Sequence, residues 1–104
     1  MSARDKTSIR WRPNLTMDID PDSDVRYTWH WDDRLSDGED IDTYEFVVTG
    51  AGEVKAHARE GTSLMSLISG VPEGARTRVT CRVTTTGNPP ERLDRSVTFV
   101  GRHM

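Results

Sequence analysis

A period of two in the apolar residues is the feature that most limits what this chain can fold into. In VRYTWHW, residues 25–31, large apolar side chains alternate with Arg26, Thr28 and His30. Successive side chains of a strand point to opposite faces of a sheet, so the pattern predicts a strand with one buried face. TRVTCRV and RSVTFVG repeat it later in the chain. We expect the buried sides to hold Val25, Tyr27, Trp29, Trp31, Val79, Cys81, Val83, Val97 and Phe99.

Further strands are expected between these runs. IDTYEFVVTG places Tyr44, Phe46 and Val48 on one face, and weaker candidates are SIRWR, LTMDI, EVKAHA and SLMSLI. Turn sequences rich in Asp, Pro, Gly and Asn separate the runs at short intervals. The predicted fold class is therefore all-β, an immunoglobulin/fibronectin type III-like β-sandwich of about seven strands.

Length and composition favour one small domain with a lean core. A chain of 104 residues supports one hydrophobic core, and we expect an N-terminal arm over residues 1–13 and a sandwich domain over residues 14–104. Only 34% of the residues are hydrophobic and 30% are charged. A core this lean suits a thin two-layer fold that gains stability by docking on a partner.

The charges are unevenly distributed along the chain. From Asp18 to Glu45 there are eleven acids against two arginines, whereas from Arg76 onward six arginines face Glu91 and Asp94. This division predicts that the folded protein has an acidic side and a basic side, as in proteins that dock through complementary charge.

The stretch DIDPDSD, residues 18–24, raises the question of a metal site. A helix-loop-helix calcium loop counted from Asp18 would need Gly and Glu where Ser23 and Trp29 stand, so this type of loop is excluded. A looser site stays open, in which the acids of the stretch meet those of residues 32–42. The simpler interpretation is a solvated turn that leads into the aromatic strand.

Other chemistries find little support in the residues. Cys81 is the single cysteine, so it can form neither an internal disulfide nor a cysteine-based zinc site alone, and the three histidines show no metal-ligand spacing. We therefore predict no catalytic, cofactor-binding or metal-binding residues and no enzymatic activity. The alternating arginines of residues 76–82 lack interleaved aromatics for base stacking, so they predict a salt-bridged sheet surface or a protein-docking face rather than a nucleic-acid surface. No apolar run approaches the roughly 20 residues of a membrane span, and we expect a soluble chain made in a cytoplasm.

Two segments resemble a known family. DSDVRYTWHWDDRLSDGEDI, residues 22–41, holds an acidic turn, an aromatic strand and the sequence Leu-x-Asp-Gly-x-x-Ile. Residues 70–101 hold a glycine-rich turn, a Val/Thr strand ending in paired threonines, and an Arg-Ser start of the last strand. Together they resemble small tailed-bacteriophage virion proteins, some of which are labelled fibre-tail adaptors. That family usually has a tyrosine after the glycine-rich turn, where this sequence has Thr77.

The resemblance implies structural work in the virion, as a capsid decoration or minor capsid protein or as a fibre-tail adaptor. The implied partners are major capsid, tail or fibre proteins and further copies of the chain, with no nucleic acid and no membrane. From the residues we predict docking through Trp11, Arg12, Asp18, Asp20, Asp22, Asp24, Arg76, Arg78 and Arg82.

A second interpretation, from another class, is a carbohydrate- or cell-surface-binding accessory module. In that case exposed aromatic side chains, with Trp11 and Tyr44 as the candidates, would contact a glycan.

Overall fold

The computed structural model describes residues 8–9 and 15–103. Within these residues the chain forms a short 3-10 helix, η1 (Asp32–Arg34), and eight strands. In chain order the strands are β1 (Ser8–Ile9), β2 (Thr16–Ile19), β3 (Val25–His30), β4 (Ile41–Thr49), β5 (Glu53–Glu60), β6 (Ser63–Ser69), β7 (Arg76–Thr85) and β8 (Arg92–Gly101).

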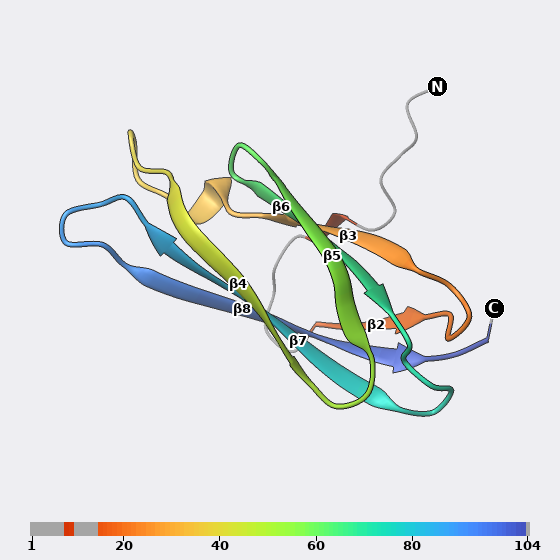
Figure 1. Cartoon of the computed structure of the whole chain (residues 1–104). Coiled ribbons are helices and arrows are strands. Elements are labelled where there is room, and N and C mark those ends of the chain that lie inside the picture. Colours follow the sequence, from red (N-terminus) through yellow and green to blue (C-terminus); the bar gives the residue numbers. More distant parts are fainter. Residues whose placement is uncertain (1–7, 10–14, 104) are drawn as a thin grey trace, which may run out of the picture.

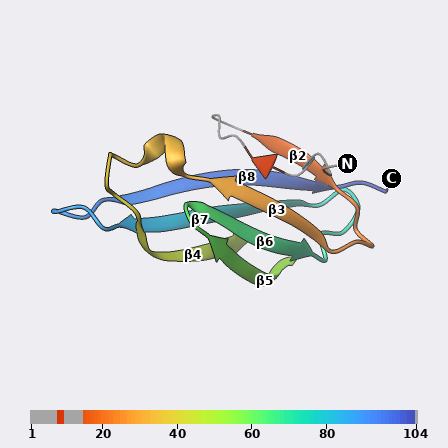
Figure 2. The ribbon, with the colours of Figure 1, turned by 90° about the horizontal axis from the view of Figure 1, so that it is seen from above.

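The strands form two sheets packed face to face (Figures 1 and 2). The first sheet has the order β1-β3-β6-β5 and the second the order β2-β8-β7-β4. β1 runs parallel to β3 and β2 parallel to β8, while the remaining pairs are antiparallel. The predicted all-β sandwich is confirmed. If β1 and β2 are taken as two halves of strand A, the sheets have the A-B-E-D and A-G-F-C order of immunoglobulin-type sandwiches.

The core lies between the sheets and is formed by the residues whose period of two predicted it. Trp29 and Trp31 of the aromatic strand are fully buried, as are the inward side chains of β7 and β8. Val25 is only half-buried, at the start of β3. The Trp29 indole Nε1 donates a hydrogen bond of 2.9 Å to the buried Ser66 hydroxyl, so the polar atoms of Trp29 and Ser66 are satisfied.

The loops gather at two opposite ends of the sandwich (Figure 1). At one end the DIDPDSD turn lies beside the chain's last residues, where the Arg102 amide donates to the Ile19 carbonyl at 2.9 Å. At the other end the loop containing η1 lies beside the β7–β8 loop, where the Thr86 amide donates to the Asp40 carbonyl at 2.9 Å. The two acid-rich segments of the chain therefore lie at different ends of the molecule.

Thr77 anchors the start of β7 and stands where the family that the sequence resembles usually has a tyrosine. Its side chain is fully buried, and its hydroxyl donates to the Ala51 carbonyl in the β4–β5 turn. The turn approaches β7 so closely that a Cβ on Gly50 would lie 2.8 Å from the Arg76 carbonyl oxygen, and Gly50 also has a φ of +110°. A small hydroxyl residue and a glycine thus make the connection between strand and loop.

The buried Cys81 thiol and Tyr27 hydroxyl make the stability of the fold decrease at alkaline pH. Burial raises the pKa of the Cys81 thiol from its ordinary 9.0 to about 12, and burial followed by the nearby Asp18 raises the pKa of Tyr27 from 10.0 to about 12. Above about pH 9 the unfolded chain releases protons that the folded chain keeps. The free energy of unfolding should therefore fall as pH rises, at up to about 1.4 kcal/mol per pH unit for each group. Below about pH 9 both groups are protonated in the folded and in the unfolded chain, so the free energy of unfolding keeps its full value.

Urea unfolding between pH 7 and pH 11 measures this dependence. Cys81→Ala should remove the part of the decline that begins near pH 9 and leave the part due to Tyr27. A free energy of unfolding that stays constant across this range would contradict the prediction.

Candidate docking surfaces

The outward side of β7 carries three arginines, which we call the arginine face: Arg76, Arg78 and Arg82. They alternate with buried residues, as the period of two predicted. Arg82 forms a two-pronged pair with Asp94 on β8, through Nε to Oδ1 at 2.9 Å and Nη2 to Oδ2 at 3.2 Å. Arg76 and Arg78 are exposed and form no ion pair within the part of the chain that the structure describes. These two guanidinium groups are free to contact a partner.

Hydroxyl side chains surround the arginine face. Arg78 lies opposite Thr49 on one neighbouring strand and opposite Thr98 on the other. The Thr80 and Ser96 hydroxyls are 2.8 Å apart and share a hydrogen bond. The outer side of the second sheet is therefore a polar surface rich in hydrogen-bonding groups, which suits a wet protein contact.

The acids of DIDPDSD are largely engaged within the molecule. Asp18 pairs with Arg102 at 3.0 Å, and Asp24 pairs with Lys55 at 2.9 Å and so raises the pKa of that lysine. The Asp20 carboxylate accepts a 2.9 Å hydrogen bond from the Asp22 amide, which closes the turn. This geometry agrees with the simpler interpretation of the stretch as a turn.

The structure does not bring this turn to the acids of residues 32–42, and the looser metal site combining the two is wrong. A different residue joins it, because β8 ends beside the turn. Side-chain ligand atoms of Asp20, Asp22 and His103 lie within 4.8 Å of one another. This grouping could not be predicted from the sequence, because His103 lies about eighty positions away from the turn. Asp22 and His103 are exposed, and surface acids of this kind are common without an ion.

The predicted separation into an acidic and a basic side is also wrong. The sheet order places β2 beside β8 and β4 beside β7, so the acid-rich and arginine-rich segments lie next to each other. Ion pairs join them, including Asp18 with Arg102 and Asp33 with Arg95. Neutralisation across neighbouring strands replaces the dipole that the linear sequence suggested.

Arg95, in the Arg-Ser start of the last strand, is buried, which was not predicted from the sequence. Its side chain is 3% exposed, and its Cζ lies 4.5 Å from the centre of the Trp31 ring. Its Nη2 is 2.8 Å from the Asp33 Oδ1, and its Nη1 donates to the His30 carbonyl. The period of two could have indicated this burial, because Arg95 lies two residues before Val97, on the inward-facing side of β8.

The aromatic side chains do not form an exposed platform in the described part of the chain. Trp29 and Trp31 are fully buried, and the Tyr44 hydroxyl is 2.9 Å from His57 Nδ1. Trp11 and Arg12 lie outside the described residues. No observation here favours a glycan-binding surface.

Fold and surfaces together are those of a small β-sandwich structural module. The family described as Podophage GP4 fiber-tail adaptor protein gp77 matches residues 20–100. This match spans more than half of the chain, so the chain belongs to that family of phage structural proteins, and the resemblance seen in the sequence is confirmed. Neither the curated proteins nor the solved structures contain a match. The described residues include no helix long and apolar enough to cross a membrane.

Proposed function

We propose that this protein is a non-enzymatic virion component that joins a fibre to the tail of a phage particle. The family match over residues 20–100 carries the proposal. The family's description names a fibre-tail adaptor, and we therefore favour this role over capsid decoration. Its partners are tail and fibre proteins of the same particle.

The chemistry of the described residues supports docking rather than catalysis. Cys81, the single thiol, is fully buried, and its raised pKa keeps it protonated and unreactive. The titratable side chains that gather at the DIDPDSD turn include Asp22 and His103, and both are open to solvent. Catalytic acids and bases normally depend on a cleft that shifts their pKa values.

We assign one of the two contacts of the adaptor to the arginine face. Arg76 and Arg78 present unpaired positive charge on a polar surface, and a partner with an acidic patch would complement it. Contacts of this kind speed association and weaken as salt screens the charges.

Charge reversal at Arg78 tests this contact. In a host that supplies only the Arg78→Glu variant to the phage, we expect the number of copies per virion to fall by at least about tenfold, because the acidic patch now meets a like charge. Arg34→Glu is the matched control, since it makes the same charge change at another exposed arginine without an ion pair in the described chain. Quantitative mass spectrometry of purified virions, washed at low and high salt, measures both.

The outcomes separate two levels of the proposal. Virions that contain no wild-type chain would refute the adaptor role itself. Equal incorporation of Arg78→Glu and Arg34→Glu would refute only the role of the arginine face. The docking roles predicted for Trp11, Arg12, Asp18, Asp20, Asp22 and Asp24 stay predictions, to be tested by neutralising these residues in the same assay.

A further inference from the structure

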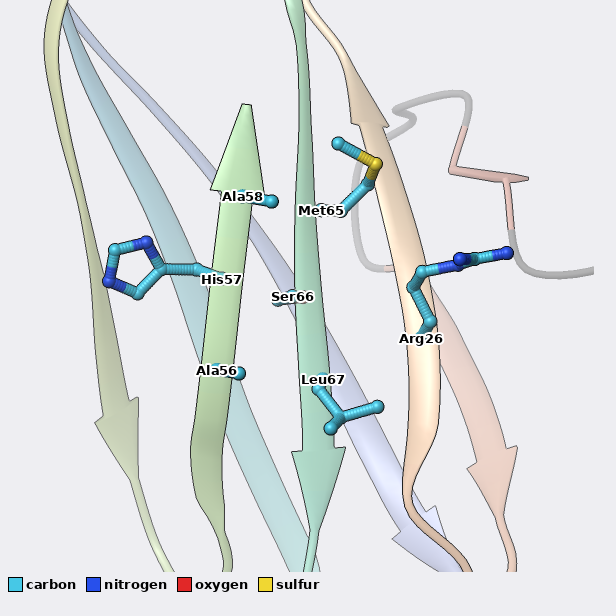
Figure 3. Close-up of a pocket in the computed structure, with 7 residues that line it drawn as sticks. All are labelled: Arg26, Ala56, His57, Ala58, Met65, Ser66 and Leu67. Atoms are coloured by element: carbon cyan, nitrogen blue, oxygen red, sulfur yellow. The ribbon is translucent and has the colours of Figure 1, made fainter. Parts of the chain in front are cut away.

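The outer side of the first sheet carries a shallow apolar hollow of about 200 Å³ (Figure 3). This is several times the roughly 30 Å³ that a water molecule occupies in the liquid, so the hollow can hold a side chain. It extends over three adjacent strands, β5, β6 and β3. We call it the alanine hollow, and its outward-facing residues are Arg26, Ala56, Ala58, Met65 and Leu67.

The residues of the alanine hollow depart from the usual pattern of a solvated strand. Leu64 and Ile68 fill the inward positions of β6, so Met65 and Leu67 point to the outside, where polar residues normally stand. Ala58 is opposite Met65 in register, as Ala56 is opposite Leu67. The small alanines beside the longer side chains create the depression and leave its walls apolar.

One positive charge stands at the rim of the hollow. Arg26 on β3 is exposed and lies opposite Leu67. The nearby cations of β5 are engaged, since Lys55 pairs with Asp24 and Arg59 pairs with Asp40. Arg26 has no ion pair among residues 15–103. A ligand of this surface should combine an apolar group with a carboxylate.

We propose that the alanine hollow receives an apolar side chain of a second virion protein, and that a carboxylate of the same partner segment pairs with Arg26. This inference rests on the proposed adaptor function, because an adaptor needs two separate docking surfaces. The hollow lies on the first sheet and the arginine face on the second, so the two contacts are on opposite sides of the sandwich.

The edge of β5 argues for contact through the face rather than by strand addition. β5 is the last strand of its sheet, but a bulge between Val54 and Ala56 interrupts its register. Four of its side chains are charged: Glu53, Lys55, Arg59 and Glu60. Bulges and charges on an edge strand oppose pairing with another strand. The partner segment is therefore expected to lie across the sheet and not to extend it.

Two other occupants fit the chemistry less well. The lining of the hollow contains no acid, so the hollow of a second copy has no carboxylate to offer Arg26. The chain's own residues 1–7, MSARDKT, bring Arg4 and Lys6 against the single acid Asp5. A partner of different sequence meets both requirements.

A lysine placed in the hollow tests the proposal. We expect Ala58→Lys to reduce either the copies of this chain or the number of fibres per virion by at least about tenfold, because docking would bury an unpaired charge in the apolar hollow. Ala51→Lys is the matched control, as it makes the same change at an exposed alanine in the β4–β5 turn, and it should leave both quantities within twofold. Circular dichroism of the purified variants checks their folding, and Arg26→Gln offers a second variant that leaves the hollow open.

Crosslinking identifies what occupies the hollow. A photoreactive phenylalanine analogue at Ala58, in virions grown with that variant, should crosslink to a virion protein different from the one captured from Arg78. A crosslink from Ala58 to another copy of this chain would overturn the proposal. Full incorporation and fibre attachment with both Ala58→Lys and Arg26→Gln would overturn it as well, while leaving the adaptor role and the arginine face intact.

Discussion

Replacing Arg95 by alanine should lower the free energy of unfolding by about 3–5 kcal/mol. The guanidinium is almost fully buried, packs on the Trp31 ring and donates to the His30 carbonyl. Its ion-pair partner Asp33 is 54% exposed, so solvent screens that pair and it contributes little. Most of the expected loss therefore comes from the cavity above the tryptophan and from the removed donor.

Two companion variants separate these causes. Arg95→Met keeps most of the volume over Trp31 and should cost less than Arg95→Ala, by about 1–2 kcal/mol. Asp33→Asn should cost less than about 1 kcal/mol, because it affects only the exposed end of the pair. Urea unfolding at pH 7 measures all three. A cost for Arg95→Ala no greater than that for Asp33→Asn would show that the buried arginine does not stabilise the sandwich.

The burial of Arg95 indicates that this shared residue has a structural role. Arg95 belongs to the Arg-Ser start of the last strand, one of the features shared with the phage proteins, yet its side chain points into the core. Thr77, at the position of the family's usual tyrosine, is equally buried. Arg95, which the chain shares with the family, and Thr77, where it departs from the family, thus both maintain the sandwich, while the proposed docking groups are exposed residues such as Arg78 and Arg26.

The strands themselves could be predicted because burial in a sandwich repeats at every second residue. The pattern even separates the two sides of β7, so the arginine face followed directly from it. Pairing across strands could not be predicted in the same way. That Arg82 is engaged by Asp94 depends on the β7–β8 register, which the period of two leaves undetermined.

The alanine hollow escaped the sequence analysis for a related reason. SLMSLI has apolar residues on both sides of the strand, and a single buried face accounts only for Leu64 and Ile68. The outward pair, Met65 and Leu67, becomes meaningful only when β5 contributes alanines beside it. β5 and β6 are adjacent in sequence, but which of their residues face outward can be stated only when the residues that face the core are known.

Proximity between distant segments was the least predictable property. Acidic and basic stretches that are far apart in the chain lie side by side because the last strand pairs with β2. This pairing joins Asp18 to Arg102 and brings His103 to the DIDPDSD turn. Segments that are distant in the sequence were expected to lie on different sides of the protein, but the sheet order places them side by side.

The end of β8 carries the second large expected effect, in Gly101→Ala. A Cβ on Gly101 would lie 2.6 Å from the Pro72 carbonyl carbon, 2.7 Å from the Val71 oxygen and still closer to the Pro72 oxygen. The glycine cannot move aside easily, because its amide donates to Ala75 at 3.0 Å and its carbonyl accepts from Gly74 at 2.9 Å. Because backbone rather than a flexible side chain is in the way, the substitution should cost about 3 kcal/mol or more.

Gly61→Ala distinguishes steric exclusion from the conformational preference of glycine. Gly61 has a φ of +61° but no atom within 4 Å of an added Cβ, so only its left-handed backbone is unfavourable for alanine, at about 1 kcal/mol. At Gly101, by contrast, the backbone is not left-handed, but atoms of residues 71–72 occupy the place of an added Cβ. If the close approach of residues 71–72 limits the structure, Gly101→Ala will have the larger effect in urea unfolding. Should Gly61→Ala be the more destabilising of the two, the packing of this loop against β8 would be looser than its geometry indicates.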